Sequence, residues 1–500
     1  MVVSLLLLVP AVVGLFLVTG GRTLAVEPAR LTAAGAAGLT LVLAVAVSIA
    51  RPTVDLAWLP ELGVRWSFGV DGIAVPLVLL TALIGVLVAA HAWVDVPAGG
   101  TPATFLGCLL IVEAGALATF TARDAVLFFV AFELVLVPMW VLISRFGDPH
   151  DERARTDAGH RFILYTAVGS TLMLVGILAL VTSAGTSDLR ALATGAGAAL
   201  PAGRQLLVAV LLVLGLSVKV PVFPLHTWLP PAHTTAPTAG SVLLAAVLLK
   251  MGTYGLVRLP VSTVPDGFAR LAPVLGVAGV VGIVWGALVC LVERDLKRLI
   301  AYSSVAHMGF VALALAAGSE TGLQAALFAN IAHGVISALL FFLVGGLKQR
   351  WGSVDLTVAR PALRETSPRL GFLFILGLAA SLGLPGLAGF WGEFFSVYAA
   401  WLPAADRPRA LFVGCAVVAA IGAALAAGYS LRVARTVWVG DEPDPEAAAA
   451  TPDTRGVELV VLSVLGTLVV LLGVFPGPLL AVTADAAALI AGGGRCARTS

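Results

Sequence analysis

The sequence predicts an all-α polytopic membrane protein with about 14 transmembrane helices, each long enough to cross roughly 30 Å of hydrocarbon. Three observations support this fold class. Hydrophobic residues make up 59% of the 500 residues and charged residues only 12%, whereas a soluble domain carries about 25% charged residues. The mean hydropathy is +1.03. Continuous apolar runs recur along the whole chain, unlike the alternating pattern of a membrane β-barrel.

The apolar runs are separated by short connections, so we expect one membrane domain over residues 1–500 and no soluble catalytic domain. The expected spans are 2–20, 31–50, 70–92, 103–120, 124–144, 162–183, 205–232 (broken), 238–258, 270–292, 296–317, 322–347, 371–401 (broken), 408–431 and 457–480. The first run lacks the charged segment that begins a signal peptide, so we interpret it as a spanning helix. Most of the 30 Lys and Arg residues lie in odd-numbered connections. This bias predicts that those connections are cytoplasmic and that both termini lie on the outer face.

The composition also argues against several kinds of site. No basic cluster stands apart from acidic residues, so we expect no nucleic-acid partner. The four cysteines show no CxxC or other metal-ligand spacing, so neither a metal site nor an iron–sulfur cluster is predicted. No segment outside the spans is long enough to hold a nucleotide or a flavin.

A few ionisable residues lie inside the predicted spans, where each one costs at least about 2.5 kcal/mol on insertion scales. They are Glu113, Glu133, Lys219, Lys250, His307, His333 and Glu393. Polar residues share their helix faces: Thr253 and Tyr254 follow Lys250, Ser303 and Ser304 precede His307, and Asn330 and Ser337 flank His333. Such thin polar stripes indicate a narrow hydrated path for protons or other ions. A single histidine could instead be a structural hydrogen-bonding group, and Glu113 could simply reach the membrane interface.

Lys219 coincides with a helix break in the stretch LGLSVKVPVFPLHTWLP. Pro221 and Pro224 lack backbone N–H groups and interrupt the helix directly after the lysine. Freed backbone groups at membrane depth are tolerated only inside protein or around water. Burial disfavours a charged lysine and a nearby carboxylate favours it, so Lys219 can change its proton occupancy when its partner moves. The alternative is a kink for packing, with Lys219 in a fixed ion pair.

A second break occurs in SLGLPGLAGFWGEFF, where Pro385 and Gly386 interrupt the run. Its serine-to-proline spacing matches that of SVKVP in the first break. The match predicts two related five-helix units, 103–258 and 270–431, after N-terminal helices at 1–100 and before a final helix at 457–480. An odd number of helices inverts the second unit relative to the first, as in ion-coupled transporters. Each unit would then form a half-channel, one marked by Lys219 and the other by Glu393.

These residues resemble the motifs of a known family, the antiporter-like subunits of respiratory complex I and the Mrp sodium–proton antiporters. The likeness lies in FELVLVPMW with Glu133, VKVPVFPLHTWLP with Lys219, LLKMGTYGLVR with Lys250, AYSSVAHMGF with His307 and NIAHGVISALLFF with His333. It covers about residues 100–400. Within the family the chain most resembles subunit M of bacterial NADH-quinone oxidoreductase, because Glu393 stands where the sister subunits usually carry a lysine. Pro231 and Thr235 stand where the family's WLPDAHTEAPT stretch commonly has an acidic pair. Any contribution of those acids to hydrating the first half-channel is therefore missing here.

The resemblance implies proton translocation coupled to electron transfer elsewhere in the complex. Glu133 would pair with Lys219 and set its proton affinity. Lys250 would pass the proton along the central axis, and Glu393 would release it. His307 and His333 would assist the transfer, with accessory contributions from Glu113, His226, His233, Tyr254, Ser303 and Ser304. A lysine relay favours H⁺ over Na⁺, because a cationic side chain is a poor sodium ligand.

The same resemblance implies that this chain binds no cofactor, while NADH, FMN, iron–sulfur clusters and quinone belong to other subunits. Its partners would be neighbouring membrane subunits and the lipids of the bacterial inner membrane. An Mrp-type antiporter or a membrane-bound hydrogenase shares these motifs and is the main alternative. A lone solute symporter would need a substrate pocket near the breaks, and the sequence shows no excess of aromatic or hydrogen-bonding residues there. A non-conducting scaffold subunit would keep coupled pumping intact after Lys219→Ala.

Overall fold

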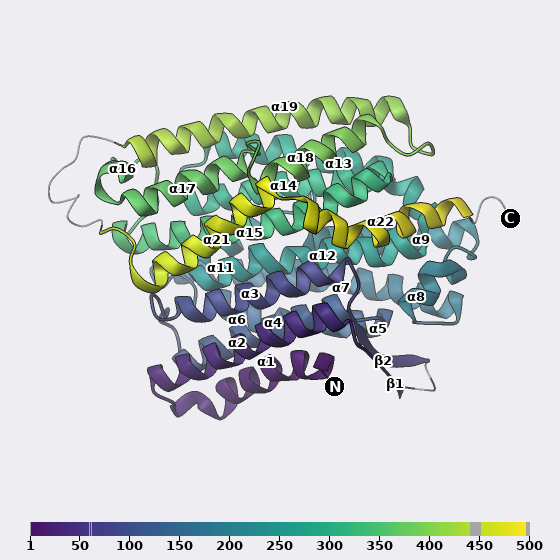
Figure 1. Ribbon diagram of the computed structural model, residues 1–500, viewed down its shortest axis with the longest axis horizontal. Helices are drawn as coiled ribbons and strands as arrows, with labels where there is room; N and C mark the ends of the chain where they lie inside the picture. The colour runs from purple at the N-terminus through teal and green to yellow at the C-terminus, as the bar shows by residue number, and fades with distance from the viewer. Residues whose placement is uncertain (1, 60, 62, 441–451, 497–500) are drawn as a thin grey trace.

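The computed structural model describes residues 2–59, 61, 63–440 and 452–496, which form a bundle of long helices with one β-hairpin. The long helices run side by side along the longest dimension in Figure 1, and the hairpin lies at one end of them. Thirteen helical segments in this part of the chain are long and apolar enough to cross a membrane. The pair α17 (Pro368–Ser381) and α18 (Ala388–Trp401) adds a broken crossing. The prediction of an all-helical polytopic fold with broken helices is confirmed.

The N-terminal part differs from the prediction in one respect, because the connection after the second span is a β-hairpin. The elements here are α1 (Val2–Thr19), η1 (Gly21–Thr23), α2 (Val26–Ala50), β1 (Thr53–Leu59), β2 (Val64–Gly69) and α3 (Ala74–His91). The strands pair antiparallel, with Thr53 opposite Gly69. The backbone N–H of Arg123 donates to Ser67 O at 2.9 Å, and Ser187 Oγ donates to Gly63 O at 3.1 Å. These contacts attach the hairpin to one end of the bundle. This end is called the hairpin face.

The first broken helix lies near the end of the chain's first half. The elements are α4 (Pro102–Thr121), α5 (Ala125–Leu134), α6 (Leu136–Ser144), α7 (Glu152–Ala184), α8 (Leu189–Ala191), η3 (Leu192–Ala196), α9 (Ala202–Lys219), α10 (Leu229–Thr235), α11 (Thr238–Leu243), η4 (Leu244–Leu248), α12 (Leu249–Leu256) and η5 (Val257–Val261). Helix α9 ends at Lys219, and Pro221 supplies no N–H to continue it. The N–H of Val222 donates to Ser217 O at 3.0 Å, and the indole of Trp228 donates to Val218 O at 2.9 Å. These two bonds satisfy carbonyls that the break deprives of helical donors.

The second broken helix is interrupted between α17 and α18, where Gly383 and Gly386 flank Pro385. The elements are α13 (Pro265–Val292), α14 (Leu296–Ala317), α15 (Glu320–Trp351), α16 (Leu363–Thr366), α17, α18, α19 (Arg409–Ala434), η6 (Arg435–Val439), α21 (Gly456–Val474) and α22 (Gly477–Cys496). Between α17 and α18, Gly383 and Gly386 have φ values of +76° and +89°. Side chains with a Cβ rarely adopt this left-handed conformation, so glycine at these positions lets the chain turn within the span.

The end of the bundle away from the hairpin is held by charged contacts and is called the opposite face. Lys348 pairs with Asp148, and Arg350 makes a bidentate pair with Glu458 at 2.8 and 2.6 Å. The short helix α16 lies at this end in Figure 1. Residues 441–451, part of a loop to which the sequence assigns no function, lie outside the described residues.

Burial divides the helices into an inner and an outer group. Helices α4, α14, α15 and the α11–α12 segment are almost entirely buried, whereas α1, α2, α19 and α21 expose most of their apolar side chains. A bilayer solvates such outer faces without cost. The inner helices carry Lys250, His307 and His333, so these residues lie in protein and not in lipid. The division of the chain into two inverted units stays a prediction.

Candidate functional site

Lys250 is fully buried at the centre of the bundle, and its ammonium group has two partners. Nζ lies 2.5 Å from His333 Nδ1 and donates to Ala245 O at 2.9 Å. The second partner exists because η4 is a π-helical turn, in which the N–H of Leu249 donates to Leu244 O. Ala245 O therefore loses the donor that an α-helix would supply, and the lysine replaces it. A π turn inside a buried helix is frequently found at functional sites.

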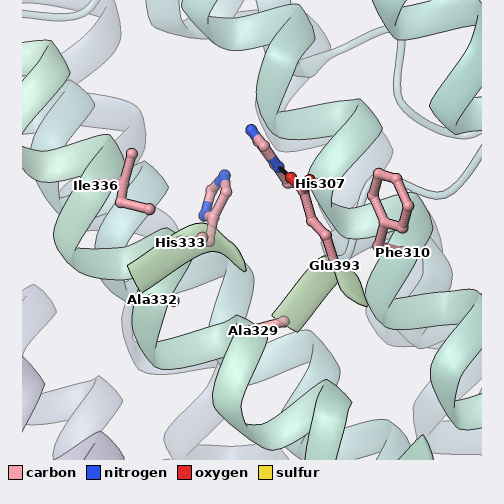
Figure 2. Close-up of a pocket in the computed structure, with 8 residues that line it drawn as sticks. His307, Phe310, Ala329, Ala332, His333, Ile336 and Glu393 are labelled. Atoms are coloured by element: carbon pink, nitrogen blue, oxygen red, sulfur yellow. Dashed lines mark ion pairs between the residues drawn. The ribbon is translucent and has the colours of Figure 1, made fainter. Parts of the chain in front are cut away.

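His333 and His307 continue the row from Lys250 toward the second break. Their ring centres are 5.4 Å apart, with the planes inclined at 60°. Both rings border a cavity of about 20 Å³, which Figure 2 shows with its lining residues from α14, α15 and α18. A water molecule needs about 10–15 Å³ of such space and several polar partners. One water can therefore join the two histidines.

Glu393 lies at the end of this row and contacts His307 directly. The distance from His307 Nδ1 to Glu393 Oε1 is 3.0 Å, marked by the dashed line in Figure 2. The other ring nitrogen, Nε2, lies 3.0 Å from Ser381 Oγ at the end of α17. The imidazole thus bridges the two halves of the second broken helix, and its hydrogen bonds fix which nitrogen faces the carboxylate.

Gly383 allows the Glu393 carboxylate to sit against the break. A Cβ at this position would lie 2.6 Å from Glu393 Oε2, a distance that only a shift of the carboxylate could relieve. Its positive φ adds backbone strain to any substitution.

Lys219 and Glu133 form the first site, which is organised differently. Lys219 is 3% exposed at the end of α9, and its Nζ lies 5.3 Å from the centre of the Phe132 ring and 5.6 Å from that of Phe162. Glu133 comes from the end of α5, where a turn at Val135 separates α5 from α6. The two charges interact electrostatically, yet among the described residues no ion pair within 4.0 Å joins them. The Phe132 and Phe162 rings, and not a direct ion pair, contact the ammonium group and stabilise its charge.

A close backbone approach brings the first site beside the central lysine. A Cβ on Gly252 of α12 would lie 3.0 Å from Lys219 Cβ, so the stem of Lys219 packs directly on the helix that carries Lys250. The two lysines therefore belong to neighbouring helix segments, although no direct contact between their ammonium groups is formed in the part of the chain described.

Two of the accessory histidines, His226 and His233, have ring nitrogens without hydrogen-bond partners among the described residues. His226 stacks on Phe223 with ring centres 5.4 Å apart, and His233 stacks on Phe341 at 4.5 Å. Within the described residues, His226 Nδ1 and both ring nitrogens of His233 have no hydrogen-bond partner. Both rings therefore retain free positions for water or a proton.

The remaining accessory residues do not belong to the row from Lys250 to Glu393, because they bond to backbone carbonyls or lie at another cavity. Ser303 and Ser304 both donate to Ile300 O of their own helix, at 2.8 and 3.2 Å. Tyr254 donates to Phe120 O at 2.8 Å. Glu113 is buried against Gly85 beside a separate cavity of about 10 Å³, lined by residues of α2, α3, α4 and α11.

Sequence reasoning did not assign a site role to three features of this arrangement. Ser381 entered only as a marker of the repeat, although its spacing from the second break was the available signal. The aromatic surroundings of Lys219 come from helices distant in sequence. The carbonyl of Ala245 carries no sequence signal at all. Among the described residues, no group of three or more His, Cys, Asp or Glu is placed to hold a metal ion.

The inner row of ionisable side chains and the two broken helices define a membrane subunit of the antiporter type. Residues 122–418 match the family described as "NADH:quinone oxidoreductase/Mrp antiporter, TM", and the chain belongs to this family. The family prediction is confirmed.

Relatives and solved structures agree with this assignment. NAD(P)H-quinone oxidoreductase chain 4 1 of Synechococcus sp. (strain JA-3-3Ab) is 40% identical over 421 residues, covering 84% of this chain and 78% of the relative. The chain 4 1 protein of Nostoc sp. (strain PCC 7120 / SAG 25.82 / UTEX 2576) is 38% identical over 421 residues, covering 84% and 76%. A chain of respiratory complex I from Thermus thermophilus with bound NADH superposes with a TM-score of 0.85 at 30% identity, covering 98% of this chain and 100% of that one. A chain of the Mrp complex from Dietzia sp. DQ12-45-1b gives 0.84 at 25% identity, covering 97% and 52%.

Proposed function

We propose that this chain is the M-type membrane subunit of an NADH-quinone oxidoreductase and that it translocates protons, driven by electron transfer in other subunits. The observation that carries the proposal is the row Lys250, His333, His307 and Glu393. Its members are linked by direct contacts of 2.5 and 3.0 Å and by one water-sized cavity. Proton transfer needs groups within hydrogen-bond reach or one water apart. This row meets that condition from the centre of the bundle to the second break.

The geometry supports a sequence of steps. Lys219 takes up a proton through the first half-channel, and Glu133 raises its affinity when the two approach each other. Movement of Glu133 away favours release toward Lys250, on whose helix the stem of Lys219 packs. His333 and His307 accept and return the proton through their two ring nitrogens. Glu393 then releases it through the second half-channel. His226, which stacks on Phe223 in the first break, and His233, which stacks on Phe341 of α15, would assist near the first site.

The ion carried is H⁺ in this proposal. Lysine ammonium groups repel a metal cation, and the His307 ring, whose two nitrogens lie 3.0 Å from Glu393 Oε1 and from Ser381 Oγ, suits proton transfer better than sodium coordination. An Mrp-type antiporter or a membrane-bound hydrogenase is the second candidate, because the family description includes both an oxidoreductase and an antiporter. Coverage favours the oxidoreductase, since this chain spans all of the Thermus chain but 52% of the Dietzia chain.

Orientation and partners complete the proposal. The opposite face bears Lys348, Arg350 and their neighbours, so the positive-inside rule places it in the cytoplasm of a bacterial cell and the hairpin face outside. Both termini then lie outside. Other membrane subunits and lipid cover the exposed apolar faces. NADH, FMN, iron–sulfur clusters and quinone belong to other subunits. The two five-helix units at 103–258 and 270–431 supply the two half-channels, the first without the acids that Pro231 and Thr235 replace.

The test is Lys250→Met in the assembled complex, measured in membrane vesicles. We expect NADH-driven proton uptake to fall at least about ten-fold, since a positioned proton-transfer group contributes at least that much. The matched control is Lys348→Met, which removes a lysine from an ion pair at the opposite face. Unchanged pumping by an assembled Lys250→Met complex would contradict the proposal.

A further inference from the structure

Arg258 is a charged residue that the row from Lys219 to Glu393 does not use. It lies in η5, two turns beyond Lys250 on the same helix, toward the hairpin face. Lys250, Tyr254 and Arg258 are spaced four apart and therefore share one side of the helix. A proton moving between Lys250 and the hairpin face along this side would have to pass Tyr254 and Arg258.

The guanidinium group of Arg258 is held in place by a neighbouring helix. It forms an ion pair with Asp71, whose Oδ1 also accepts from the N–H groups of Ile73 and Ala74 at 3.1 Å each. These bonds fix Asp71 before the start of α3. The side chain of Asp71 is 47% exposed and that of Arg258 is 18% exposed. The cation therefore lies deeper in the bundle than the anion that holds it.

Tyr254 forms an aromatic layer between Arg258 and Lys250. The guanidinium carbon lies 5.0 Å from the centre of the Tyr254 ring, which packs against Phe120 at 5.3 Å and Phe128 at 6.3 Å. The hydroxyl of Tyr254 donates its one proton to Phe120 O. A hydroxyl committed to a backbone carbonyl cannot pass a proton on without breaking that bond.

The polar contacts of Lys250 end at this layer. Thr253 Oγ1 donates to Asn330 Oδ1 at 2.7 Å and also lies 3.1 Å from Lys250 O, so polar side chains continue for one turn from the lysine toward the hairpin face. Farther toward the hairpin face lie the buried rings of Tyr254 and Phe120, and then the guanidinium group of Arg258. A guanidinium group remains charged at any physiological pH, and fixed arginines are known to exclude protons and other cations from pores.

We propose that Arg258, held by Asp71 and backed by Tyr254, is a fixed-charge barrier that blocks proton leak between Lys250 and the hairpin face. The barrier leaves His333 as the outlet for a proton on Lys250, which gives the pathway its direction. This inference rests on the proposed proton-translocating function. It requires no movement of Arg258 during turnover.

The experiment measures passive proton leak, so its outcome is independent of pumping. The purified whole complex is reconstituted in liposomes, a membrane potential is imposed with potassium and valinomycin, and proton entry is followed with a trapped pH dye without NADH. We expect Arg258→Met to raise the leak at least about ten-fold, because one unit charge within roughly 12 Å of a path changes the rate by at least that factor at an effective dielectric constant of about 20. NADH oxidation should persist, with fewer protons pumped per NADH.

Two further variants separate charge from packing. Arg258→Lys keeps the positive charge, and we expect its leak to match that of the unmodified complex. Arg350→Met removes an arginine from a similarly buried ion pair at the opposite face and should not leak either. If Arg258→Met fails to assemble, Arg258→Gln keeps a hydrogen bond to Asp71 and tests the same loss of charge.

Either of two results would overturn the barrier. One is an assembled neutral variant with unmodified leak, and the other is equal leak in Arg258→Lys and Arg258→Met, which would assign the effect to packing. Failure of the proposed function is seen separately, as an unmodified complex that oxidises NADH without pumping.

Discussion

The two broken helices hold their charges in opposite ways. At the first break, Lys219 lies among aromatic rings, and Glu133 acts on it from outside hydrogen-bond distance. At the second break, Glu393 contacts His307, and His307 contacts Ser381. One site keeps its acid and base apart, and the other keeps its acid and base in contact.

The two arrangements differ in whether the proton affinity of the charged group can change. An ion pair that can open and close changes the proton affinity of its lysine, because a nearby carboxylate favours the charged form and burial disfavours it. A row of touching groups offers no such change but passes a proton readily. In the proposed pathway, the first site would therefore switch the proton affinity of Lys219 and the second would transfer the proton. Variants at the two sites should fail in different ways.

The largest effect is expected at the first site. Lys219→Ala removes the switched group, and Glu133→Ala removes the charge that switches it, so each should lower proton pumping at least about ten-fold. NADH-driven proton uptake in vesicles measures this, with assembly checked by native gels. Glu152→Ala, at an exposed glutamate of α7, is the control. Normal pumping by an assembled Glu133→Ala complex would refute the role of Glu133 in controlling the proton affinity of Lys219.

A smaller but still large effect is expected at Glu393. Glu393→Gln keeps the shape and a hydrogen bond to His307 but cannot carry a proton, so pumping should fall several-fold, toward the ten-fold scale of a lost proton-transfer group. Glu458→Gln, which alters a buried glutamate paired with Arg350, serves as the matched control. Full activity of Glu393→Gln would place proton release elsewhere.

The smallest effect is expected at His307. His307→Ala enlarges the cavity beside His333, and water can bridge the gap left by one side chain. Pumping should fall about two- to three-fold, as a loss in rate with assembly unchanged. His91→Ala removes a buried histidine outside the row, whose ring contacts that of Phe342 at 4.9 Å between centres, and provides the comparison. A loss as large as that of Lys219→Ala would mean that the second site also switches.

The sequence singles out the residues of both candidate sites because each is expensive to place in a membrane. Lys219, Lys250 and Glu393 stand out against apolar neighbours, and prolines mark the breaks. Their pairing could not be predicted so well. The separation of Glu133 from Lys219 depends on where Phe132 and Phe162 pack, which is a tertiary property. Ser303 and Ser304 share a helix face with His307, but their hydroxyls bond to their own helix, as serine commonly does.

Two elements of the fold left no clear trace in the sequence. The β1–β2 hairpin occupies a short connection whose alternating residues were outweighed by the apolar runs around it. The π turn in η4 lies in a continuous run of Leu, Val and Ala, where one widened turn changes no residue type. Arg258 is the last residue of the expected span 238–258, and its contacts with Asp71 and Tyr254 show that it belongs to the bundle.

The widened turn at Leu244–Leu248 has a consequence for timing. Since Ala245 O remains available to the Lys250 ammonium, the lysine keeps a partner when His333 takes a proton from elsewhere or turns aside. The hydrogen bond to Ala245 O can therefore stabilise the protonated Lys250 while His333 is not its partner. In the proposed pathway, a proton could therefore arrive at Lys250 before the redox step that draws on it begins.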